Sequence, residues 1–207
     1  MLKKHTILLG ILAAIILLWV STTKYPGGSQ HDVNGIGFHW QHNYLSNLLN
    51  PVAVNGEPNA AQPWAVAGVI VLALSGAVFF ARFSKKIPKK SAANVVKWTG
   101  IGAMLFSILV ATPLHDMAVM VSGILSLVSI FYITVFVFMT KLHWFKLLCV
   151  ACMLAIYVCF FVYNWHVGIA YLPMIQKTTL LLQIGWILSL DYFAKAEDFQ
   201  LAPRGSK

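Results

Sequence analysis

The chain is divided into apolar runs of about 20 residues, each bounded by a short polar segment. The runs cover residues 6–23, 64–83, 95–114, 117–140, 145–165 and 171–193. As a helix, an apolar run of about 20 residues crosses a hydrocarbon core about 30 Å thick. We therefore predict an all-α fold, a polytopic membrane helix bundle with about six transmembrane helices, forming a single integral membrane domain over residues 1–207.

The overall composition supports this class. Hydrophobic residues make up 59% of the chain and charged residues 10%, whereas a soluble domain carries about 25% charged residues. The net charge of +9 raises the question of nucleic acid, but the chain has neither a Gly-rich phosphate loop nor a basic run interleaved with aromatics. We therefore expect the lipid bilayer, and no nucleic acid, as a partner.

The basic residues predict the orientation of the chain. If six helices alternate from a cytoplasmic N-terminus, all of the 15 Lys and Arg residues except Lys24 and Lys177 face the cytoplasm. Cytoplasmic loops of membrane proteins carry such an excess. The predicted topology is N-in and C-in, with a long structured outer loop over 24–63 and a cytoplasmic tail over 194–207. The first run, after "MLKK", also fits a signal peptide, but "WVSTTKYP" has no obvious small-x-small cleavage site, which favours a retained helix.

The outer loop contains the most unusual stretch, "HWQHNYLSNLLN" (residues 39–50). Its polar residues His39, Asn43, Ser46 and Asn50 recur with a helical period, and apolar residues fill the other side. This pattern predicts a helix over 40–49. Such a helix either anchors in the headgroup region or covers the mouth of the bundle. Five of the seven histidines share the predicted outer side: His31, His39, His42, His115 and His166.

Polar stripes enter two of the predicted helices from that side. One consists of His115, Ser122, Ser126 and Ser129, and the other of Gln176, Thr179 and Gln183. Small and hydroxyl residues also serve helix packing in membranes, so packing and a ligand pathway both remain open. Lys177 lies near the outer boundary of the predicted last helix. A charge deep in the bilayer costs about 2.5–3.5 kcal/mol. Lys177 either snorkels outward or pairs with Asp116 or Asp32, and we favour the pair.

These residues define the candidate site. His115 is predicted as a general base or metal ligand, with Asp116 orienting it and Ser46 as a polar contact. Candidate ligand-binding residues are His39, His42, Asn43, His166, Gln176 and Lys177. If a divalent metal binds, His39, His42 and His115 are its expected ligands. The H-x-x-H spacing without a Glu is a weak metal signal, so hydrogen-bonded histidines are the alternative.

The stretch "YPGGSQHD…GFHWQHNYLSNLL", together with "LHD" at 114–116 and "IQK…GW" in the last helix, resembles the six-span bacterial membrane family catalogued as domain of unknown function 998. The resemblance implies the six-span fold and a bacterial cytoplasmic membrane, with the His-rich loop outside. It implies no activity. Asn47 stands where that family has an acidic residue.

Three classes of function fit the sequence. The first is an enzyme acting on a lipid or envelope precursor at the outer face, through a His/Asp/Ser site. The second is a carrier or sensor of a small molecule, and the third is a non-catalytic membrane scaffold. An enzyme requires His39, His115, Asp116, His166 and Lys177 to converge, a carrier requires the two polar stripes to meet inside the bundle, and a scaffold leaves these residues scattered.

Overall fold

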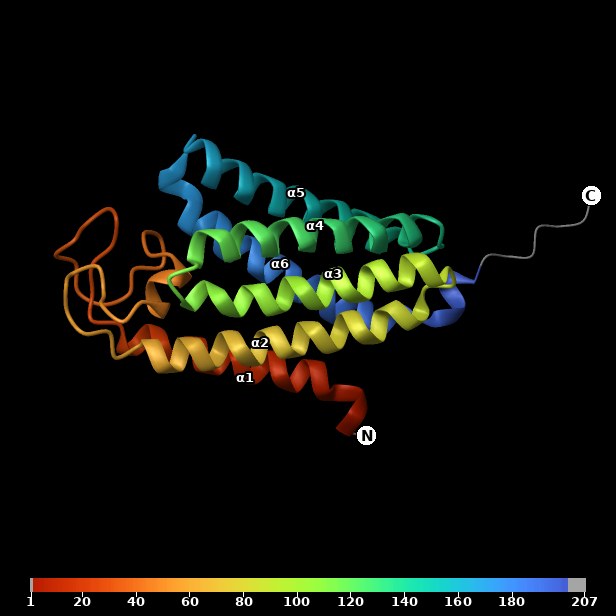
Figure 1. Ribbon diagram of the computed structural model, residues 1–207, viewed down its shortest axis with the longest axis horizontal. Helices are drawn as coiled ribbons and strands as arrows, with labels where there is room; N and C mark the ends of the chain where they lie inside the picture. Colours follow the sequence, from red (N-terminus) through yellow and green to blue (C-terminus); the bar gives the residue numbers. More distant parts are fainter. Residues whose placement is uncertain (1, 201–207) are drawn as a thin grey trace, which may run out of the picture.

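The computed structural model describes residues 2–200 and consists of long helices joined by loops (Figure 1). The long helices are α1 (Leu2–Lys24), α2 (Gln62–Phe83), α3 (Lys90–Ile108), α4 (His115–Phe138), α5 (His143–Trp165) and α6 (Leu172–Phe193). The short 3₁₀ helices are η1 (Leu45–Leu49), η2 (Ser84–Lys86), η3 (Leu109–Ala111), η4 (Ile169–Tyr171) and η5 (Ala196–Phe199). Residues 2–200 form no β-strand.

Within residues 2–200, five helices are long and apolar enough to cross a membrane. They run over Lys4–Lys24, Gln62–Lys86, Lys90–Ala111, His115–Phe138 and His143–Trp165. The predicted all-helical class is therefore confirmed, and the five apolar helices are compatible with the predicted membrane bundle. α6 is of similar length, but Gln176, Lys177 and Gln183 lower its hydropathy.

Successive helices pack side by side and run up and down (Figure 1). The loop between α1 and α2, at the left of Figure 1, lies at the same end as the α3–α4 and α5–α6 connections. α1 begins, and α6 ends, at the opposite end. α6 packs along α5 and also contacts α1 and α2, which closes the bundle around its interior.

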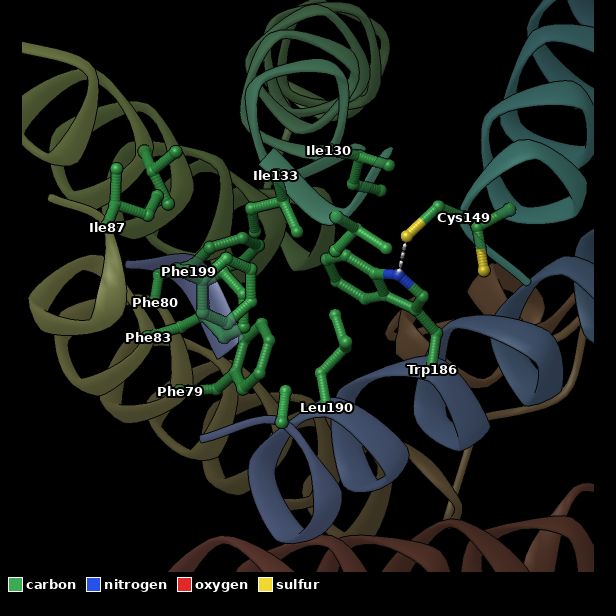
Figure 2. Close-up of a cluster of buried hydrophobic side chains, with 14 of the residues drawn as sticks. Phe79, Phe80, Phe83, Ile87, Ile130, Ile133, Cys149, Trp186, Leu190 and Phe199 are labelled. Carbon is green, nitrogen blue, oxygen red and sulfur yellow. Dashed lines mark hydrogen bonds between the residues drawn. The ribbon is translucent and has the colours of Figure 1, made fainter. Parts of the chain in front are cut away.

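An aromatic core fills the end of the bundle away from the long loop (Figure 2). Phe79 and Phe83 of α2 face Trp186 of α6, whose ring centroid lies 5.4 Å from that of Phe79. The Trp186 indole N–H donates to Cys149 Sγ at 3.2 Å. Cys149 is therefore a buried packing group, as expected for a thiol in an apolar helix.

Two glycines let neighbouring helices approach closely. A Cβ at Gly10 of α1 would clash with Ser75 Oγ of α2, and a Cβ at Gly100 of α3 would clash with the Phe80 ring. Small residues at such interfaces are a common device of membrane helices, because apolar lipid gives helices no hydrophobic reason to associate.

Most helix boundaries differ from the prediction by a few residues, and three of the differences bear on the site or the tail. The helix predicted over 95–114 starts earlier, at Lys90, and its α-helical part ends earlier, at Ile108, where η3 follows. His115 is the first residue of α4 and does not lie in a loop before it. The predicted tail begins with η5, whose Phe199 is buried against Phe83. The tail residues 201–207 lie outside the described range.

The helix predicted over 40–49 is the clearest error. The structure has only η1 (Leu45–Leu49) there, preceded by turns. The Lys177 ammonium of α6 donates to the backbone carbonyl of Asn43, and the side-chain amide of Asn43 donates to Gly28 O in the loop. With these bonds in place, the stretch does not continue as an α-helix. The spacing of the polar residues suggested one face of a helix. In the structure, polar residues of this stretch instead form hydrogen bonds within the loop.

Candidate functional site

The loop over 25–61 is held in one conformation by buried polar side chains. The Tyr25 hydroxyl donates to Gly28 O and accepts from Val54 N. Asn43, with none of its surface exposed, donates to the same Gly28 oxygen at 2.6 Å and accepts from His39 N. Burial raises the pKa of Tyr25, which keeps the hydroxyl protonated as a donor. The "YPGG" sequence is thus an architectural motif.

A single asparagine ties the second half of the loop together. The Asn59 amide nitrogen lies 2.7 Å from Asn50 O and 3.2 Å from both Asn47 O and Leu48 O. Its amide oxygen accepts from Ala61 N, at the start of α2, at 3.0 Å. These bonds fix η1 relative to α2.

α6 holds the loop from the other side. Gln176 Oε1 accepts from Leu45 N at 3.0 Å, which anchors the start of η1. The Lys177 ammonium donates to Asn43 O and to Pro173 O. Two adjacent residues of α6 therefore bind the loop backbone across about 130 residues of sequence, and η1 lies over the interior of the bundle.

Beneath η1 lies a cavity of about 730 Å³, which we call the mouth cavity. Ser46 and Asn47 of η1 form one wall, and the first turn of α4 and the end of α5 form others. Its polar lining residues are Gln30, Tyr44, Ser46, Asn47, Asn50, His115, Asp116, Tyr163, Asn164, His166, Gln176, Thr179 and Gln183. Its volume is in the range of small-molecule sites. Five of the predicted site residues therefore line one space: Ser46, His115, Asp116, His166 and Gln176.

At the rim of the mouth cavity, three side chains are linked. His115 Nδ1 lies 3.0 Å from Asp116 Oδ1, and the Tyr163 hydroxyl donates to the same oxygen at 2.7 Å. Asp116 is largely exposed, with 86% of its side chain accessible, and His115 is about one-third exposed. A carboxylate on Nδ1 fixes the imidazole tautomer, which leaves Nε2 as the nitrogen that can exchange a proton with a ligand.

The mouth cavity continues into the bundle. A second space of about 320 Å³, which we call the inner cavity, is lined by Ser122 and Ser126 of α4 and by apolar side chains of α1, α2 and α3. Residues common to both cavities include Ser46, Gly123, Gln176, Thr179 and Gln183. The two polar stripes, one on α4 and one on α6, therefore face a single interior path. Ser129 is an exception, because it bonds to Thr99 of α3 at 2.6 Å and joins two helices.

The remaining predicted residues do not belong to this site. His39 is exposed, and His42 stacks on His31 with ring centroids 4.4 Å apart. Asn43 is a buried structural residue of the loop. Lys177 binds backbone carbonyls, and no salt bridge over residues 2–200 joins it to a carboxylate, so the expected pair of Lys177 with Asp116 or Asp32 is wrong.

The candidate metal ligands also fail to converge. In the part of the chain that the structure describes, no group of three or more His, Cys, Asp or Glu side chains is placed to hold a metal ion. His39 and His42 belong to the loop surface, whereas His115 lies on the rim of the mouth cavity. The set His39, His42 and His115 is therefore not a preformed metal site.

Comparison with other proteins adds no identity. No family, curated protein or solved structure matches the chain. The chemistry of the site therefore stands on its geometry alone.

The sequence reasoning missed several residues of the mouth cavity, of which Tyr163 and Asn164 are the most informative. They end α5 in "YNWH", and the only signal was two polar groups in the last turn of an apolar helix. Gln30 and Asn47 were also missed, and their amides face each other across the loop at 3.4–3.5 Å. Burial, with Cys159 nearby as a lesser cause, raises the pKa of Tyr44, so this wall of the cavity presents a neutral hydroxyl.

Proposed function

We propose that this chain is a multi-pass membrane protein that binds an amphipathic small molecule, with the polar part in the mouth cavity and the apolar part in the inner cavity. The observation that carries the proposal is the continuity of the two cavities through Ser46, Gly123, Gln176, Thr179 and Gln183. A ligand that lies along this path meets ionisable and amide groups first and apolar helix faces next. A lipid or an envelope precursor has this distribution of polarity.

The proposed placement in the membrane makes α6 the sixth span. Lys177 and Gln176 are engaged with the loop, so the polar residues at the start of α6 need not face lipid. The connections after α2 and α4 carry Lys85, Lys86, Lys89 and Lys141, and they lie at the end opposite the long loop. The positive-inside tendency then puts that end in the cytoplasm and the mouth cavity outside. The resemblance of the outer loop to a bacterial six-span family supports the bacterial cytoplasmic membrane as the location.

The test blocks the path with a bulky side chain at a residue that lines both cavities. Gly123 of α4 lines both cavities, and a Cβ there would only touch the Phe160 ring, at 3.4 Å. Gly123→Phe therefore places a ring in the path with little backbone strain. Gly185→Phe is the matched control, because Gly185 lies mid-helix in α6 with nothing within 4 Å of a Cβ there.

The measurement is native mass spectrometry of each variant released from cell membranes, together with its melting temperature. We expect the wild type and Gly185→Phe to carry a bound species of defined mass that Gly123→Phe lacks, while all three remain folded. Equal retention of that species by Gly123→Phe would contradict the proposal.

A second candidate function is an enzyme that acts on the bound amphiphile. The observation that favours it is the His115–Asp116–Tyr163 chain, which orients the imidazole at the rim of the mouth cavity. In this role His115 is the general base, Asp116 fixes its tautomer, and Ser46 contacts the substrate. His115→Gln would then abolish turnover of a lipid substrate but leave its binding intact. If the purified wild type leaves the bound species unchanged during prolonged incubation, the binding function stands alone.

A further inference from the structure

Side-chain amides line the mouth cavity from several elements at once. They belong to Gln30 of the outer loop, Asn47 and Asn50 at η1, Asn164 of α5, and Gln176 and Gln183 of α6. The hydroxyls of Ser46 and Thr179 line the same cavity. An amide carries N–H donors and an acceptor oxygen, and a hydroxyl both donates and accepts. This lining is suited to a ligand whose own polar groups both donate and accept.

Two of these amides are held in place by the fold through one of their two polar atoms. The Gln176 oxygen accepts from Leu45 N at 3.0 Å, so the NH₂ group is the half that can donate to a ligand. The Asn164 NH₂ group donates to Phe160 O at 2.8 Å, so the oxygen is the half that can accept. The cavity thus presents a held donor on α6 and a held acceptor on α5. A hydroxyl matches both, whereas an ionised phosphate has no donor and an ammonium has no acceptor.

The charge and the aromatic rings on the lining narrow the headgroup further. Asp116 is the only Asp, Glu, Lys or Arg among the lining residues in the described part of the chain. Its carboxylate repels an anionic headgroup but accepts a hydrogen bond from a hydroxyl. Tyr44 and Phe160 also line the cavity. A sugar ring has an apolar C–H face that packs on aromatic rings, and its hydroxyls project from the edge.

We infer that the mouth cavity binds an uncharged sugar headgroup, and that the amphiphile of the two cavities is a neutral glycolipid. Its acyl chain lies in the inner cavity, among the apolar side chains of α1, α2 and α3. The Gln183 amide lines both cavities, so it lies where the sugar joins the chain. This inference rests on the proposed function and deepens it, because it names the class of amphiphile.

The test measures which headgroup the protein selects. Protein purified in a polyoxyethylene detergent, which contains no sugar, is mixed with equal amounts of monoglucosyl diacylglycerol, phosphatidylethanolamine and phosphatidic acid with identical acyl chains. Native mass spectrometry counts the bound lipids. The wild type should prefer the glycolipid by about 25-fold, as for two neutral hydrogen bonds that each change the affinity about fivefold. Equal binding of the three lipids, or a preference for either phospholipid, would overturn the inference.

An amide variant assigns the preference to the cavity. Gln183→Met keeps the length of the side chain and removes no hydrogen bond from residues 2–200, because the Gln183 amide forms none there. It should lower the preference to about fivefold. Gln41→Met makes the same change at an exposed loop residue outside the lining and should keep the wild-type preference. Equal preferences in the two variants would contradict the inference.

A second pair of variants covers the case in which Gln183→Met fails to fold. Asn164→Leu removes the acceptor on α5, and Asn94→Leu makes the same change at an exposed residue of α3 that lies off the lining. Asn164→Leu should also lower the preference to about fivefold, while Asn94→Leu should keep it. Equal preferences in this pair would likewise contradict the inference.

The two proposals fail in different ways. The ratio of glycolipid to phospholipid reports on the headgroup, and the total lipid bound to Gly123→Phe reports on the path through both cavities. If Gly123→Phe loses its bound lipid but the wild type takes up the three lipids equally, only the sugar headgroup is wrong. If Gly123→Phe keeps its lipid and the sugar preference still depends on Gln183, only the continuous path is wrong.

Discussion

Replacing Asn59 by alanine is expected to release the second half of the outer loop from α2. Asn59 is 6% exposed, and its amide contacts Asn47 O, Leu48 O, Asn50 O and Ala61 N. Its own backbone N–H bonds to Pro51 O and survives the change. Asn59→Ala therefore deletes only side-chain bonds and leaves the local turn in place.

The number of donors bounds the energetic effect. An amide nitrogen has two hydrogens, so at most two of the three carbonyls are bonded at once, and the amide oxygen adds one further bond. At about 1 kcal/mol per bond, the free energy of opening the loop should fall by about 3 kcal/mol. Hydrogen exchange of the amides over 43–61 should then become roughly 150-fold faster.

Hydrogen exchange with mass spectrometry measures this difference directly. Asn34→Ala is the control, because the Asn34 side chain is exposed and only its backbone N–H is bonded, to Asp32 Oδ1. Its effect should stay within about 0.5 kcal/mol. A loss below about 1 kcal/mol in the free energy of opening the loop in Asn59→Ala would refute the inference that this residue holds the second half of the loop to α2. So would an effect that spreads equally over all helices.

Three further outcomes follow from the same contacts. Gly28→Ala should destabilise the loop more than Gly56→Ala in the same exchange assay. Both glycines have a positive φ, which costs an alanine about 1–3 kcal/mol. Only at Gly28 would a Cβ also clash with a loop backbone nitrogen. Lys86→Met should lower the melting temperature by about 5 °C, because the Lys86 ammonium binds three carbonyls at the end of α6. In a cysteine-free background on intact cells, an impermeant thiol reagent should label Glu57→Cys and miss Lys89→Cys; the reverse would contradict the proposed topology.

The helices were predictable because their signal is local. An apolar run such as 145–165 needs no distant partner to become helical in a bilayer, since backbone groups there must bond within the segment. The loop was not predictable for the opposite reason. The role of Asn43 depends on Gly28, His39 and Lys177, and the last of these lies 134 residues away.

The candidate site was partly predictable. His115 and Asp116 stood out because a histidine and a carboxylate interrupt an apolar chain, and the structure places both on the mouth cavity. Lys177 also stood out as a charge in an apolar helix, but the pattern could not show that a loop carbonyl and a carbonyl of α6 itself, and no carboxylate, would contact it. Tyr163 carries no sequence signal apart from its place at the end of α5.

The central claim, that an amphipathic ligand lies along the path through the bundle, is tested most directly by photo-crosslinking in cell membranes. A photoreactive side chain at Ser126, which lines the inner cavity, is compared with one at Phe131, which is 51% exposed on the outer face of α4. The account predicts a single amphipathic adduct at position 126 and a mixture of bulk lipids at position 131. The same mixture at both positions, or no adduct at position 126, would contradict it.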